Sequence, residues 1–274
     1  RPVSVPHGAV RNEMRRDDFA HLVRQRLRQE RGAAPRQAPF MVALAYPSPY
    51  FVAMSSLGFQ RIYGAIQSQP ALACERVFLP DDARGGPLSE LPLSYESLRP
   101  LGDFPVVAFS LAYELELAGL IQLLEAAGIP ALRSGRDERH PLVVVGGPIT
   151  FSNPLPAAVY ADVVVMGEAD TLAVELLREL EACWGAGHGS PAHADWLSAA
   201  ARLDHIFVPA LHGERLPSLA VCDDESLPAC SVIRTPDTEL SSMFLVEVER
   251  GCSRGCSYCV MRRSTNGGMR LVSP

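Results

Sequence analysis

The sequence predicts an α/β protein with a doubly wound parallel sheet, and three observations support this fold class. Short apolar runs alternate with longer segments of helical periodicity between residues 41 and 184, a pattern typical of strands joined by helical crossovers. Two of the runs contain three consecutive valines, at 143–145 and 163–165, as expected for strands covered on both faces. Strands joined by helical crossovers run parallel to one another.

The elements follow from these patterns in chain order. Residues 1–38 are polar and rich in arginine, with one helical stretch between Arg15 and Arg31, and we expect an N-terminal helical arm with a solvated basic face. The α/β domain is expected over 39–184. Its strands are predicted at 41–46, 74–78, 104–110, 141–147 and 161–168, and its helical segments at 55–67, 114–128, 154–160 and 170–184.

Ligands of such sheets bind outside the carboxyl ends of the strands. This rule points to the loops at 46–56, 110–113, 146–150 and 167–170. Gly146 and Gly147 lie where the backbone either approaches a ligand closely or makes a tight turn. Ser55, Ser56 and Ser110 could donate hydrogen bonds to a large cofactor that carries amide groups.

Residues 185–240 are expected to link two domains through short extended segments, because they open with a stretch rich in glycine, proline and histidine. Residues 241–274 are expected to begin a second domain. There the segment SSMFLVEVERGC (241–252) predicts a strand that leads directly into a cysteine loop.

The cysteine loop has the spacing C-x3-C-x2-C at Cys252, Cys256 and Cys259. With this cysteine content, one fixed spacing of three cysteines is expected about 0.005 times by chance. Three thiolates on a short loop can hold three irons of a [4Fe–4S] cluster and leave the fourth iron open to a small chelating molecule. The alternative is structural zinc, for which Cys222 or Cys230 could supply the fourth ligand.

The amino-acid composition indicates the cellular compartment and the classes of partner to expect. The net charge of −6 and the pI near 5.7 give no general attraction to nucleic acid. The chain has no apolar run of about 18 residues and no signal-peptide pattern, so we expect a cytoplasmic protein without a membrane partner. Seven cysteines, three of them within eight positions, favour a metal site in a reducing compartment over a disulfide scaffold.

The loop CSRGCSYC (252–259) follows Glu-Arg-Gly and has Tyr258 before its last cysteine. It resembles the signature of the radical S-adenosylmethionine (SAM) superfamily. The resemblance implies that Cys252, Cys256 and Cys259 ligate a [4Fe–4S] cluster whose open iron binds SAM. It also implies that an electron donor reduces the cluster, that SAM is cleaved to a 5′-deoxyadenosyl radical, and that Tyr258 lies against the adenine.

By the same resemblance, the strand before the loop would be the first strand of a partial TIM barrel. Four arginines surround the loop, and we expect them to compensate the negative charge of the cluster: Arg250, Arg254, Arg262 and Arg263.

The segment PLVVVGGPITFSNPLPAAVYADVVVMGEAD (141–170) is similar to the cobalamin-binding domain that precedes the barrel in one class of radical SAM proteins. A wider pattern over residues 40–274 resembles an uncharacterised bacterial radical SAM family. These resemblances imply a flavodoxin-like sheet and a cofactor site that includes Gly146, Gly147, Pro148, Gly167 and Glu168. The loop after the first strand (46–50, YPSPY) lacks the Asp-x-His-x-x-Gly motif that supplies a cobalt ligand, so cobalamin binding stays open.

The sequence therefore predicts a radical SAM enzyme with an unknown reaction and substrate. It begins at Arg1 and ends fifteen residues after Cys259, so we expect a C-terminally truncated piece that is inactive alone. The alternative is a non-enzymatic corrinoid- or nucleotide-binding α/β module with a structural zinc at its cysteine tail.

Overall fold

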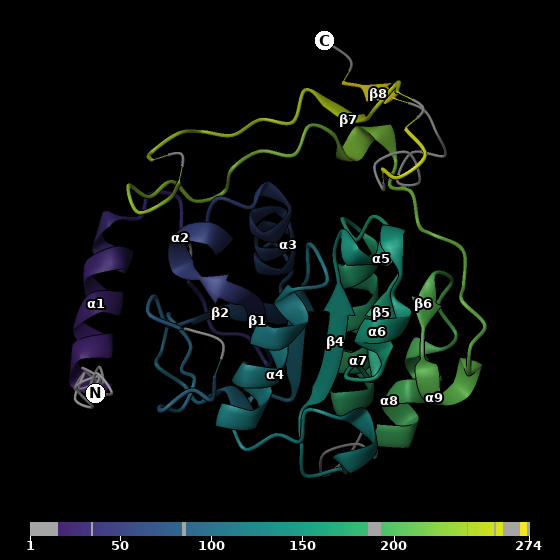
Figure 1. Ribbon diagram of the computed structural model, residues 1–274, viewed down its shortest axis with the longest axis horizontal. Helices are drawn as coiled ribbons and strands as arrows, with labels where there is room; N and C mark the ends of the chain where they lie inside the picture. Colours follow the sequence, from purple (N-terminus) through teal and green to yellow (C-terminus); the bar gives the residue numbers. More distant parts are fainter. Residues whose placement is uncertain are drawn as a thin grey trace, which may run out of the picture.

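The centre of the protein is a six-stranded sheet in the order β2-β1-β3-β4-β5-β6 (Figure 1). The computed structural model describes residues 16–33, 35–83, 86–185, 193–239, 241–254, 256–259 and 269–272. The first five strands run parallel and β6 runs antiparallel to β5. Their bounds are β1 Phe40–Pro49, β2 Leu72–Leu79, β3 Val106–Ser110, β4 Leu142–Gly146, β5 Val163–Val165 and β6 Ile206–Phe207.

The predicted parallel α/β sheet is confirmed, and the order β2-β1-β3-β4-β5 is that of flavodoxin-like folds. All five parallel strands lie where the apolar runs predict them. In this order the chain reverses direction across the sheet between β1 and β3. A switch point of this kind opens a crevice at the carboxyl ends of the strands.

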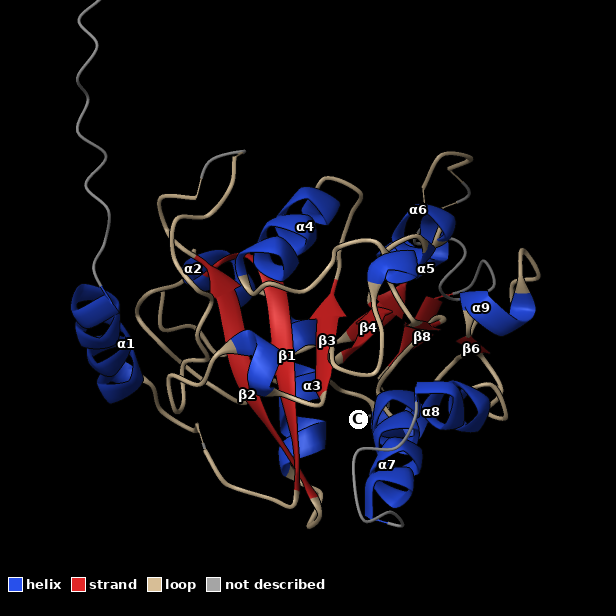
Figure 2. Ribbon diagram, turned by 90° about the horizontal axis from the view of Figure 1, so that it is seen from below, coloured by secondary structure: helices blue, strands red, loops and turns tan. Residues whose placement is uncertain are grey.

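Helices cover both faces of the sheet (Figure 2). The bounds are α1 Arg16–Gln29, α2 Tyr50–Ala53, α3 Leu57–Gln67, α4 Glu116–Ala126, α5 Ile149–Ser152, α6 Leu155–Ala158, α7 Leu172–Gly185, α8 His193–Ala200 and α9 Pro209–His212. One apolar core joins the sheet to α1, α3, α7 and α8, and the other joins it to α4, α5 and α6. Consecutive valines such as Val144 and Val145 enter opposite cores, because strand side chains alternate between faces. No helix in the described part of the chain has the length and apolar character needed to cross a membrane.

The sheet continues beyond residue 184. Helix α8 packs against α7 through stacked Trp184 and Trp196, whose ring centroids lie 5.7 Å apart. Strand β6 then adds an antiparallel edge beside β5. Both elements fall within 185–240, for which the sequence predicts a linker, and residues 186–192 of that segment lie outside the described part.

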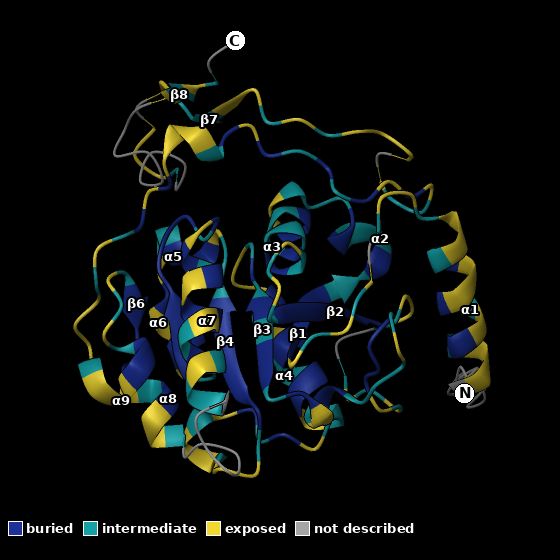
Figure 3. Cartoon of the chain, turned by 180° about the vertical axis from the view of Figure 1, so that it is seen from behind, coloured by how far each residue is buried: buried dark blue, intermediate teal, exposed yellow. Residues whose placement is uncertain are grey.

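A long double segment, residues 227–239 and 241–248, crosses the carboxyl edge of the sheet, and we call it the strap (Figures 1 and 3). Its two halves pair where Cys230 bridges Val246, and the Ser231 N–H donates to the Leu245 carbonyl at 2.9 Å. The side chain of Gln60 in α3 accepts a hydrogen bond from the Ile233 N–H at 2.9 Å. The strap therefore lies against the sheet domain.

The strap leads into a small antiparallel pair, β7 Glu249–Gly251 and β8 Met269–Leu271. The strand predicted over 241–252 is thus much shorter than its sequence pattern suggests. Its apolar side chains are largely exposed, with Phe244 at 53% and Val248 at 70%. An apolar segment forms a regular strand only where a neighbour supplies hydrogen bonds, and β8 pairs only with Glu249–Gly251.

Helix α1 is tied to the sheet by buried charges. Arg76 of β2 donates to Glu30 at 2.7 and 2.9 Å and to Glu96 at 2.6 Å, and its side chain is only 1% exposed. Arg26 contacts Asp81 and Asp237 at 2.6 Å each. The inner face of the predicted arm is therefore part of the protein's core, whereas residues 1–15 lie outside the described part.

Candidate functional site

A cavity of about 340 Å³ lies at the carboxyl ends of β1, β3, β4 and β5. It opens between the sheet, the start of α3 and the start of α7, and the strap covers it through Ala229 and Glu247. This is the switch point that the strand order predicts. A volume of this size is at the lower end of the range for ligand pockets, about 300–1,000 Å³.

The floor and walls of the cavity are mostly aliphatic. Leu44, Val144 and Val165 contribute from the sheet, and Ile62 and Ala173 from the helices. Ala108 and Gly146 lie on the same face as Val144 and are small. The cavity exists because small residues stand at these positions.

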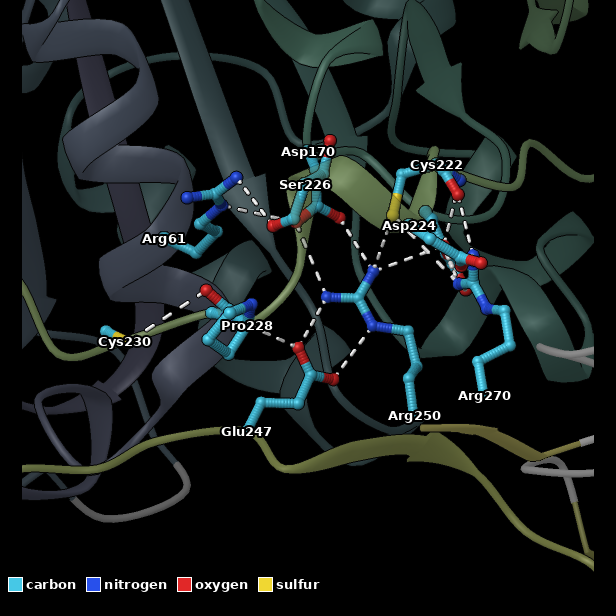
Figure 4. Close-up of polar contacts among 12 residues, drawn as sticks. Arg61, Asp170, Cys222, Asp224, Ser226, Pro228, Cys230, Glu247, Arg250 and Arg270 are labelled. Carbon is cyan, nitrogen blue, oxygen red and sulfur yellow. Dashed lines mark hydrogen bonds and ion pairs between the residues drawn. The ribbon is translucent and has the colours of Figure 1, made fainter. Parts of the chain in front are cut away.

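The rim is charged, and one arginine lies at its centre (Figure 4). Arg250 of β7 donates through Nη1 to Glu168 at 3.1 Å, to Asp170 at 3.0 Å and to the Cys222 sulfur at 3.0 Å. The Glu247 carboxylate accepts from both Nε and Nη2 of Arg250 at 2.8 Å. Because Arg250 is two residues before Cys252, these contacts attach the cysteine loop to the sheet edge.

Two further arginines pair with the carboxylates of the rim. Arg270 of β8 donates to both carboxylate oxygens of Glu168, at 2.6 and 2.5 Å. Arg61 of α3 contacts Asp170 at 3.3 Å and the Ser226 carbonyl at 3.0 Å. Arg250 was expected to compensate the charge of the cluster, but its guanidinium instead pairs with these carboxylates. Arg262 and Arg263 lie outside the described residues.

These contacts set the protonation of the rim. Burial alone would raise the pKa of Glu168, but the hydrogen bonds from Cys222 and Arg270 and the charge of Arg250 outweigh it, so the pKa is lowered. Burial, with Glu168 and Asp170 nearby, raises the pKa of the Cys222 thiol to about 12. At neutral pH the Glu168 carboxylate is therefore ionised and the Cys222 thiol is protonated.

Glu168, Asp170 and Cys222 form the one group of metal-ligating side chains in the described part whose ligand atoms all lie within 4.8 Å of one another. The Nη1 atom of Arg250 contacts all three. A guanidinium nitrogen thus occupies the position that a cation would take. The clustering of these side chains is therefore explained by their pairing with Arg250 and needs no metal ion.

The structure brings most of the predicted cofactor residues to the cavity. Those that line it are Ser56, Ser110, Gly146, Gly147, Pro148, Gly167 and Glu168. Ser55 does not line it. Its hydroxyl instead donates to the Phe51 carbonyl at 2.7 Å and accepts from the Glu239 N–H of the strap at 3.0 Å.

Two of the glycines are required by the backbone conformation, independently of any ligand. Gly147 has φ of +105°, and a Cβ there would lie 2.6 Å from the Leu111 carbonyl oxygen. Gly167 has φ of +92°, and its Cβ would lie 2.5 Å from backbone atoms of Ala220. Only glycine fits such left-handed, crowded positions. At Gly146 a Cβ would make an ordinary 3.5 Å contact with Val165, so this glycine keeps the cavity open rather than relieving a clash.

Four residues of the site were not predicted from the sequence: Arg61, Asp170, Cys222 and Glu247. Asp170 alone carried a signal, because it falls in a loop at a predicted strand end. Arg61 comes from α3, Glu247 from the strap and Cys222 from the segment after α9, and no local sequence pattern shows that these segments meet at the sheet. Cys222 was considered only as a zinc ligand.

The cysteine loop follows β7 directly. Cys252 and Cys259 are partly exposed and Cys256 is exposed, and all three are free thiols. The Arg254 N–H donates to the Cys252 sulfur at 3.4 Å, a contact of the kind that tunes cluster thiolates. Tyr258 is 88% exposed, so its ring is available to a ligand of the loop.

The two cofactors implied by the sequence fit differently. Three soft, accessible thiols on one loop suit an iron–sulfur cluster. The described lining of the cavity does not support cobalamin, because it includes no histidine that could ligate cobalt. The strap, held by Arg250, also covers the space above the strand ends where a macrocycle would lie.

Comparison with known proteins adds one finding. No curated protein and no solved structure matches the chain. A sequence model of the family described as "Radical SAM proteins, N-terminal" matches residues 58–209, which is more than half of the chain and runs from α3 to the start of α9. The match ends well before Cys252, so the cysteine loop is a separate indication of the same superfamily. The chain belongs to the radical SAM N-terminal family.

Proposed function

We propose that this chain is the front part of a radical SAM enzyme, in which Cys252, Cys256 and Cys259 hold a [4Fe–4S] cluster that binds SAM. The observation that supports it best is the placement of three free thiols on one loop directly behind β7. The family match over residues 58–209 supports it independently. When bound, such a cluster supplies an electron for the reductive cleavage of SAM.

The residues of this chain would provide the ligands and their positioning. The three cysteines would bind iron as thiolates, and the Arg254 N–H would keep its hydrogen bond to the Cys252 sulfur. Arg250 fixes β7 against Glu168 and Asp170, so the loop begins from an ordered strand. Tyr258 would pack against the adenine of SAM. An external electron donor and a substrate of unknown identity complete the system.

Anaerobic reconstitution with iron and sulfide tests the proposal. We expect about four irons and four sulfides per chain, an absorption band typical of [4Fe–4S] clusters, and an electron paramagnetic resonance signal after reduction that changes when SAM is added. Cys256→Ala should abolish stable cluster binding. Cys183→Ala, which changes a half-buried cysteine on α7, is the matched control and should retain the full iron content.

Two results would overturn the proposal. One is full cluster content in Cys256→Ala. The other is stoichiometric zinc without iron in the protein as purified without oxygen, which would assign the loop to a structural zinc site.

A further inference from the structure

We propose that the cavity between the sheet, α3 and α7 binds an uncharged, largely apolar molecule about the size of a two-ring aromatic, with its hydrogen-bonding end at Ser110. This inference concerns the sheet domain and does not depend on whether the cysteine loop holds a cluster.

The cavity is a space that the side chains of the protein leave unfilled. Protein interiors are close-packed, and an unfilled apolar cavity loses the contacts of the atoms that line it. Ala108, Gly146 and Ala173 line this cavity at positions where a larger aliphatic side chain would fill it. At Gly146 a side chain would meet Val165 only at an ordinary 3.5 Å. The protein therefore keeps a space that its own side chains could close, which is expected of a ligand site.

The charged side chains at the rim of the cavity are paired with one another. The carboxylates that line the rim are Glu168, Asp170 and Glu247. Each is paired with a guanidinium, from Arg61, Arg250 or Arg270. Three carboxylates and three guanidiniums neutralise one another. A charged ligand would have to break one of these pairs, whereas a neutral ligand leaves them intact.

Ser110 supplies a polar group that is free to bind a ligand. Ser110 ends β3 on the same face as Ala108 and lines the cavity. Its hydroxyl makes no hydrogen bond to another described residue and can both donate and accept. Tyr46 and Ser56 also line the cavity, but the Tyr46 hydroxyl bonds to Glu116 and the Ser56 oxygen accepts from the Phe59 N–H at 3.3 Å. One unpartnered hydroxyl in the described lining of a mostly apolar cavity favours a ligand with an apolar body and a single polar end.

The roof of the cavity lies next to the cysteine loop. Glu247 and Arg250 line the cavity from above, and Arg250 is two residues before Cys252. A ligand here would therefore contact the strand that carries the loop. Its size is limited by the strap, which distinguishes it from a corrinoid.

Calorimetric titration with three related probes tests the inference on the full chain. Indole is neutral, indole-3-acetate adds a negative charge and tryptamine a positive one. We expect indole to bind at least about tenfold more tightly than either charged relative, and hydroxocobalamin not to bind. Ala173→Leu should weaken indole binding at least about tenfold by filling the cavity. Ala182→Leu, the same change at an exposed position of α7, should leave it unchanged.

Ala108→Leu provides a second filling variant on β3, in case Ala173→Leu disturbs α7. Circular dichroism and thermal unfolding should show both variants folded. Indole binding that persists in both folded variants would overturn the inference. Equal affinity for the neutral and charged probes would overturn the charge argument, and tight binding of hydroxocobalamin would overturn the size limit.

Discussion

Arg250 holds Asp170 through two parallel contacts, from Nη1 to Oδ2 at 3.0 Å and from Nη2 to Oδ1 at 3.4 Å. The two residues are far apart in sequence, and the contact joins the strand before the cysteine loop to the turn before α7. Paired arginine and carboxylate groups of this kind fix orientation as well as distance. The contact therefore fixes the position of the cysteine loop relative to the edge of the sheet.

Arg250→Ala should lower the free energy of unfolding by about 3 kcal/mol, because it leaves the buried carboxylates of Glu168 and Asp170 without their shared partner. Urea unfolding followed by circular dichroism measures the change. Arg139→Ala removes an exposed pair with Asp137 and serves as the control, with no measurable effect expected. Equal stability of Arg250→Ala and the parent chain would contradict this assignment.

The lowered pKa of Glu168 predicts an acid-dependent loss of stability. The folded pKa lies below the unfolded value of about 4.3, so the ionised form is favoured by folding. Its contribution is complete above the unfolded pKa and disappears as the pH falls through the folded pKa. The difference in unfolding free energy between the parent chain and Glu168→Gln should therefore shrink as the pH falls below about 4.

The pKa of Glu116 is shifted in the opposite direction, so the pH dependence of its contribution to stability provides a comparison. Burial raises its pKa, so folding favours the protonated form and its contribution to stability is lost as the pH rises. A parallel pH series for Glu116→Gln should change in the other direction. Identical pH profiles for the two variants would contradict the assigned shifts.

Adjacent glycines should respond differently to alanine. Gly147→Ala should lower stability by about 2 kcal/mol or more, because its positive φ and a Cβ 2.6 Å from the Leu111 carbonyl oxygen both oppose a side chain. Gly146→Ala should be neutral or up to about 1 kcal/mol stabilising. Thermal unfolding of the two variants measures the contrast. Similar behaviour would show that the backbone does not require glycine at 147.

Cys222 and Cys256 should differ in reactivity. The pKa of Cys222 is raised to about 12 and its side chain is buried, whereas Cys256 is exposed. Alkylation requires an accessible thiolate. Brief treatment of the cluster-free chain with iodoacetamide near neutral pH should modify Cys256 and spare Cys222, as read by peptide mass spectrometry. In urea both should react, which verifies that protection of Cys222 comes from the fold.

The sheet could be predicted because its strands are locally encoded. Val143–Val145 and Val163–Val165 are apolar on both faces, and the cysteine spacing is a contiguous pattern. The crevice followed from the alternation of strands and helices. Each of these features depends on neighbours in sequence.

The remaining features depend on contacts between distant residues. Arg250 meets Glu168 and Asp170 from the far end of the chain, and β6 is a two-residue edge strand with little pattern of its own. Arg76 did carry a signal, since a charge inside an apolar strand must be paired. Its partners, Glu30 and Glu96, could not be chosen from the sequence.

Helix α1 and the residues that follow it hold both the strap and the sheet, which limits where a shorter fragment of the protein can begin. Besides its contacts with Ser55 and Gln60 in the middle, the strap is attached at both ends. Near α1 it is held by Arg26 with Asp237 and by the backbone pairing of Arg31 with Arg234, and near β7 by Arg250. A fragment beginning at residue 39 would lose the first of these end contacts and would also strand Arg76 without Glu30. The cover over the cavity would then lose its attachment near α1, so a fragment that keeps the strap in the position described here should begin at or before Arg16.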